Sequence, residues 1–63
     1  MCLATVYRCS KETETVVLKN VSKIQVQGNE VHLFDIMGME EVVEGTISMA
    51  DLTGGVVKIE CPA

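Results

Sequence analysis

Short strand-like segments separated by turn residues fill almost the whole sequence, and this pattern limits the fold most strongly. Residues 22–27 alternate cleanly, with Ile24 and Val26 facing one way and polar side chains the other. The other expected strands cover residues 3–8, 13–19, 31–36, 41–50 and 56–61. No segment has a useful helical period of 3.6 residues. We therefore expect an all-β fold, a small antiparallel barrel of about six short strands, similar in size to Sm-like and SH3-like domains.

The turn residues support a meander of neighbouring strands. The Gly28-Asn29 pair predicts a two-residue hairpin turn, because both residue types tolerate a positive φ. Asn20 is expected to mark a turn between the second and third strands, and residues 51–55 a further hairpin turn. Gly45 interrupts the long segment 41–50, where a bulge or a sharp bend of the kind that small barrels need at their corners is expected.

The length of 63 residues predicts a single small β-barrel domain over residues 1–63. A chain this short buries only roughly 60% of its unfolded surface, so we expect extra stabilisation from a disulfide, a metal ion or a second copy. Residues 31–36 carry apolar side chains on both faces, with Val31 and Leu33 opposite Phe34 and Ile36. A strand with one buried face does not need both sets. Homodimerisation, with two-fold symmetry, is therefore expected.

Cysteine usage predicts a reducing compartment. The three cysteines, Cys2, Cys9 and Cys61, are an odd number and too sparse for a disulfide scaffold. The first residues lack the basic and apolar regions of a signal peptide, and no run approaches the ~20 apolar residues of a membrane span. We expect a soluble cytoplasmic protein with free thiols.

Charge and motif content exclude several functional classes. The net charge is −4, whereas nucleic-acid binding draws on cationic contacts to phosphate, and Tyr7 and Phe34 are the only aromatic residues. A small-barrel RNA-binding module is therefore a disfavoured alternative. With one histidine and no G-x-S-x-G, P-loop or C-x-x-C motif, the chain is not expected to be an enzyme. The acidic residues Glu40, Glu41 and Glu44 match no calcium loop and predict a solvated rim.

Three residues remain as metal-ligand candidates, Cys2, Met1 and His32, and Cys2 is the strongest. Its thiolate, its backbone nitrogen and the α-amino group of Met1 can close consecutive five-membered chelate rings on one metal ion. Nitrogen and thiolate donors in planar chelates suit nickel(II) or copper(II), whereas zinc prefers a tetrahedron. In a two-fold dimer, Cys2 of each chain would complete four-coordination. Residue type alone also allows a small apolar thiol that begins a strand, and it allows His32 to be a packed, hydrogen-bonded residue.

Three stretches match the pattern of one family: the opening "MCLATVY", the hairpin "VSKIQVQGNEVHLFDI" and the final hairpin "GTISMADLTGGVVKIE". The chain resembles the CooT family of small nickel-binding accessory proteins. This resemblance implies a homodimer of small barrels that binds Ni(II) through Cys2 and acts as a metallochaperone or storage protein. It also implies a nickel-enzyme maturation partner, such as carbon monoxide dehydrogenase. Met1, through its terminal amine or backbone, and His32 are further candidate ligands.

Overall fold

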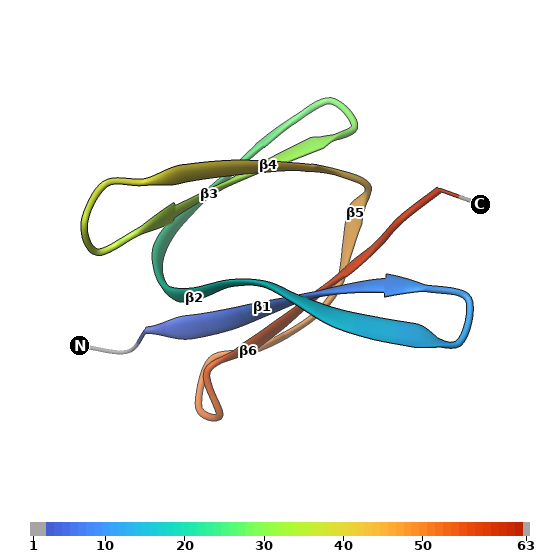
Figure 1. The fold of residues 1–63 in the computed structure, drawn as a ribbon, viewed down its shortest axis with the longest axis horizontal. Coiled ribbons are helices and arrows are strands. Elements are labelled where there is room, and N and C mark those ends of the chain that lie inside the picture. Colours follow the sequence, from blue (N-terminus) through green and yellow to red (C-terminus); the bar gives the residue numbers. More distant parts are fainter. Residues whose placement is uncertain (1–2, 63) are drawn as a thin grey trace.

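The computed structural model describes residues 3–62, which form six strands and no helix, so the all-β prediction is confirmed (Figure 1). The strands are β1 (Ala4–Ser10), β2 (Thr13–Gln27), β3 (Glu30–Asp35), β4 (Glu40–Glu44), β5 (Thr46–Asp51) and β6 (Val56–Glu60). Within this part of the chain, nothing has the length and apolar character of a membrane-crossing helix. The predicted hairpin at Gly28-Asn29 joins β2 to β3.

All six strands form one strongly curved sheet in the order β4-β3-β2-β1-β6-β5 (Figure 1). The described residues form no ladder between the edge strands β4 and β5, so the sheet is open and the predicted closed barrel is wrong. The expected antiparallel arrangement is also wrong for one pair, because β1 and β6 run parallel. After β4 the chain crosses to the opposite edge of the sheet. The β5–β6 hairpin therefore meets β1 from the far side, which local sequence patterns do not specify.

Strand β2 is a single bent strand where two strands were expected. Asn20 has a left-handed backbone, with φ of 58°, but it kinks the strand and does not end it. Both ladders of β2 shift register close to this kink. Val21, the next residue, pairs with Ala4 of β1 on one side and Asp35 of β3 on the other. The kink lets one strand join both neighbours while the sheet curves.

Gly45 makes the bend that the sequence predicted, and it divides the expected strand 41–50 into β4 and β5. Its φ is 153°, and a side chain there would collide with the carbonyl oxygen of Glu60. The Gly45 amide donates to the carbonyl oxygen of Asn29 at 2.8 Å. Glycine is required here because the backbone of β6 passes directly beside the corner.

The core lies on the inner face of the curved sheet. Seven buried residues from five strands make it up: Val6, Val21, Val31, Leu33, Val43, Val57 and Ile59. Of the second apolar set on residues 31–36, Phe34 is half-buried beneath the ammonium group of Lys23, 4.5 Å from the ring centroid, and Ile36 is exposed. The homodimer inferred from this set stays a prediction.

Candidate functional site

The strongest ligand candidates, Met1 and Cys2, lie outside the described residues. The chain immediately after them is held firmly by the sheet. β1 is a central strand with β2 on one side and β6 on the other, and Ala4 pairs with Val21. Thr5 donates its amide hydrogen to the carbonyl oxygen of Gly55 at 2.8 Å. The Met-Cys pair therefore precedes a backbone that is fixed within two residues of the cysteine.

A shallow cavity of about 250 Å³ lies beside the start of β1. Its walls are mainly apolar and include Ala4, Ile24, Leu52 and Val57, with Ser22 among the few polar residues. The Ser22 hydroxyl lies 3.4 Å from two backbone carbonyl oxygens of β3, to which it can donate. This depression supplies no carboxylate, imidazole or thiol from the described residues.

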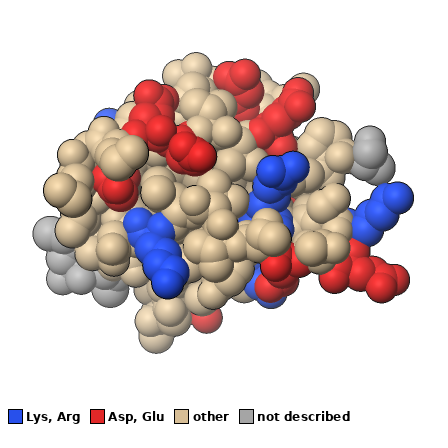
Figure 2. Space-filling model, viewed as in Figure 1, with Lys and Arg blue, Asp and Glu red and all other residues tan. Residues whose placement is uncertain are grey.

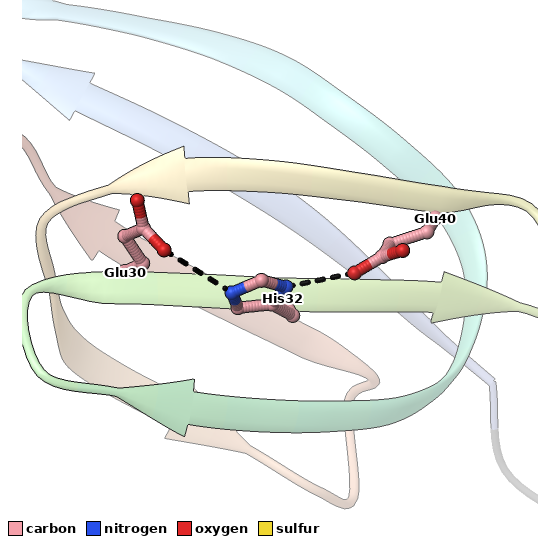
Figure 3. Close-up of polar contacts among 3 residues, drawn as sticks. All are labelled: Glu30, His32 and Glu40. Atoms are coloured by element: carbon pink, nitrogen blue, oxygen red, sulfur yellow. Dashed lines mark hydrogen bonds and ion pairs between the residues drawn. The ribbon is translucent and has the colours of Figure 1, made fainter.

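His32, the auxiliary ligand candidate, lies between two carboxylates on the outer face of the sheet (Figure 3). Its Nδ1 is 2.7 Å from Oε2 of Glu40 on β4, and its Nε2 is 3.4 Å from Oε1 of Glu30 on its own strand. The side chain is only 17% exposed. The Nε2 atom is buried without a well-formed hydrogen bond, so the Glu30 contact is a long ion pair.

This placement favours the protonated imidazolium. The hydrogen bond with Glu40 raises the pKa of His32 above its usual value, opposed by desolvation and aided by Glu30. A neutral ring would present a lone pair to one of the carboxylates, whereas the imidazolium donates toward both. Metal binding instead needs a neutral ring with a free lone pair. The geometry therefore suits an ion-paired link between β3 and β4, the packed, hydrogen-bonded alternative that the sequence allowed.

The two described cysteines are free thiols on opposite faces of the sheet. Cys61 packs against the core, and its sulfur accepts a hydrogen bond from Nε of Arg8 at 3.1 Å. Cys9 faces outward, with its sulfur 3.7 Å from Oε2 of Glu14, which also pairs with Lys58 at 2.9 Å. Desolvation and the Glu14 carboxylate raise the pKa of the Cys9 thiol, so it stays protonated at neutral pH. Neither thiol lies in a cluster of side chains that could hold a metal ion within residues 3–62.

The acidic residues of β4 do not gather into a cation site. Glu40, Glu41 and Glu44 are exposed along this edge strand, and several acidic side chains lie across the upper part of the molecule, where β3 and β4 lie (Figure 2). Within residues 3–62, no three His, Cys, Asp or Glu side chains are grouped so as to hold a metal ion. Glu41 and Glu44 fit the solvated acidic rim that the sequence predicted, whereas Glu40 is paired with His32.

Comparison with known proteins decides the family. A family model described as CO dehydrogenase accessory protein CooT matches residues 1–60. The chain belongs to the CooT family. Among solved structures, a crystal structure from Carboxydothermus hydrogenoformans that carries the CooT assignment superposes with a TM-score of 0.88 at 21% identity, covering 98% of this chain and 100% of that one. This likeness confirms the fold. No curated protein matches the chain significantly.

Proposed function

We propose that this CooT-family protein is a cytoplasmic nickel(II)-binding accessory protein, a metallochaperone or storage protein and not an enzyme. The observation that carries the proposal is the Met-Cys start of a chain whose family serves CO dehydrogenase. The Cys2 thiolate, with the backbone nitrogen of Cys2 and the amine of Met1, forms the planar nitrogen and thiolate chelate that nickel(II) prefers. Nickel is the cargo, destined for the enzyme that the protein helps to mature.

The described residues support Cys2 by offering no rival site. His32 is engaged by two carboxylates, Cys61 packs against the core and Cys9 is hydrogen-bonded to a carboxylate. The fixed backbone from Ala4 onward also limits the conformations that a chelate at the Met-Cys pair must lose on binding. A ligand set built at the start of β1 therefore needs no rearrangement of the sheet.

We further propose that the working unit is a homodimer in which each subunit supplies one Cys2 thiolate. A mainly apolar row on the outer face of the sheet, interrupted by the ion-paired Lys58, supports a second copy. Val16, Tyr7, Lys58 and Met49 are neighbours across β2, β1, β6 and β5, and both Val16 and Met49 are exposed. Covering such a row would supply apolar burial that a chain of this size lacks.

The test is a nickel(II) titration of the wild type beside Cys2→Ser. We expect thiolate-to-nickel charge-transfer absorption that saturates at about one nickel ion per dimer, because one thiolate and one of the nitrogens from each of two chains make up four-coordination. Cys2→Ser should lose this absorption, whereas the matched control Cys9→Ser should keep it. Binding should weaken as the pH falls, because the thiol and amine must lose their protons. Equal nickel affinity of Cys2→Ser and wild type would refute the proposal.

A further inference from the structure

The loop between β3 and β4 exposes three large apolar side chains to solvent. Ile36 is 56% exposed, Met37 is 85% exposed and Met39 is 65% exposed. The turn itself needs none of them, because only Gly38, with φ of 87°, has a backbone that favours a particular residue type. Clustered exposed apolar side chains mark interaction surfaces, and methionine is enriched in them.

The backbone of this loop is held rigidly in place. Oδ1 of Asp35 accepts hydrogen bonds from the amides of Met37 and Met39, both at 2.9 Å. Two backbone bonds of 3.0 Å close the turn, from the Gly38 amide to the Asp35 carbonyl and from the Asp35 amide to the Met39 carbonyl. The apolar side chains are therefore presented by an ordered platform, and a partner that covers them pays little loop-ordering entropy.

The loop leads directly into the acidic edge strand β4. Glu40, Glu41 and Glu44 are exposed on it, and one side of its backbone has no neighbouring strand among the described residues. Two cationic side chains of β2 and β3 are already engaged in other contacts. Lys23 lies over the ring of Phe34, and His32 is paired with Glu30 and Glu40. Figure 2 shows the resulting excess of carboxylates over this part of the molecule.

This charge distribution determines which kind of protein surface can bind here. A second copy docked here by two-fold symmetry would place the glutamates of one β4 against those of the other, which is unfavourable. A protein with lysine or arginine side chains around an apolar pocket is complementary to both features. We propose that residues 36–44 are the docking surface for such a partner, the nickel enzyme that this protein serves. The choice of enzyme rests on the function proposed above.

The position of the loop fits delivery of cargo from the start of the chain. Asp35, Val21 and Ala4 form one cross-strand row, so the loop begins two strand spacings, about 10 Å, from the first residue of β1. The Ile36 amide also donates to the Asn20 carbonyl oxygen at 3.1 Å, which joins the loop to the same row. A partner seated on residues 36–44 lies beside the end of the sheet at which β1 begins.

The test measures binding to nickel-free CO dehydrogenase, immobilised for biolayer interferometry. Replacing both loop methionines, Met37→Ser with Met39→Ser, should weaken binding about tenfold or more, because exposed apolar anchors carry much of the interface affinity. The matched control Val26→Ser removes another exposed apolar side chain, from β2, and should bind as the wild type does. Glu41→Lys with Glu44→Lys should weaken binding at low salt but much less at ~0.5 M salt.

Two further variants separate this inference from the proposed function. Cys2→Ser should keep its docking affinity while losing nickel, and the methionine double variant should keep its nickel affinity. Failure of wild type to bind the enzyme, while it still binds nickel, would overturn the docking surface alone. Equal enzyme affinity of the wild type and the methionine double variant would overturn it as well. So would a change in oligomeric state of that variant in analytical ultracentrifugation, because the loop would then belong to the contact between copies.

Discussion

The corner at Gly45 gives the most direct test of the fold, through Gly45→Ala. With φ of 153°, an L-residue there is strained by about 2 kcal/mol. The new methyl group would also collide with the Glu60 carbonyl and lie 3.1 Å from Cγ2 of Ile59, a fully buried residue that has no room to move. Overpacking of this kind costs about 2 kcal/mol more. The expected loss of about 4 kcal/mol is a large part of the roughly 3–9 kcal/mol that such a domain possesses.

Gly28→Ala is the matched control for this substitution. Gly28 also has a left-handed backbone, with φ of 58°, but nothing lies within 4 Å of an added methyl group. We expect a loss of only about 1 kcal/mol. Urea unfolding followed by far-UV circular dichroism, at one protein concentration, should show the difference in midpoint with an unchanged m-value. If the two variants differ by less than about 0.5 kcal/mol, the close approach of β6 to the corner is not what requires glycine.

Three further changes test the core, the histidine link and the β3–β4 loop. Leu33→Ala empties a fully buried position and should lower the unfolding free energy by about 3 kcal/mol in the same urea assay. Because Glu40 raises the pKa of His32, protonated His32 stabilises fully below its unfolded pKa, and this stabilisation disappears as the pH rises through the folded pKa. Wild type should therefore lose stability over that range relative to His32→Gln, and an NMR titration should place the imidazole pKa above its usual value. Asp35→Ala removes the acceptor of two loop amides, so it should cost about 1–2 kcal/mol and speed hydrogen exchange at both amides.

Local signals in the sequence predicted the strands well, but they did not predict how the strands associate. The alternation in residues 22–27 and the Gly28-Asn29 turn predicted the β2–β3 hairpin, because side-chain alternation and turn type are properties of neighbouring residues. Parallel pairing of β1 with β6 depends on residues about fifty positions apart, and the turn residues say nothing of it.

Asn20 shows why a correct local interpretation can still give a wrong boundary. Asparagine tolerates a left-handed φ, and such a residue can either end a strand or kink it. The outcome depends on whether the next residue finds partners. Val21 pairs with Ala4 and Asp35 and is buried in the core, so the strand continues. These partners belong to β1 and β3, and no short stretch of sequence around Asn20 contains both Ala4 and Asp35.

Of the two carboxylate contacts of His32, only the one with Glu30 could be predicted from the sequence. Glu30 lies two positions before it, so alternation alone places both side chains on one face of the strand. Glu40 reaches Nδ1 only because the short loop sets the register between β3 and β4. The same loop carries Met37 and Met39, which are exposed. Their exposure was not predictable, because it depends on the hydrogen bonds of Asp35 that hold the loop away from the core.

The proposed division of labour between Cys2 and the β3–β4 loop follows from what a nickel carrier has to do. A closed site made from several side chains of a rigid sheet would hold the ion firmly and release it slowly, as structural metal sites do. A chelate at the start of the chain uses few ligands, and an incoming enzyme can replace them one at a time. Such an open site gives little selectivity for the recipient, so recognition has to come from another surface. The rigid apolar loop and the acidic strand β4 can provide it, because they bind through contacts that do not involve the metal.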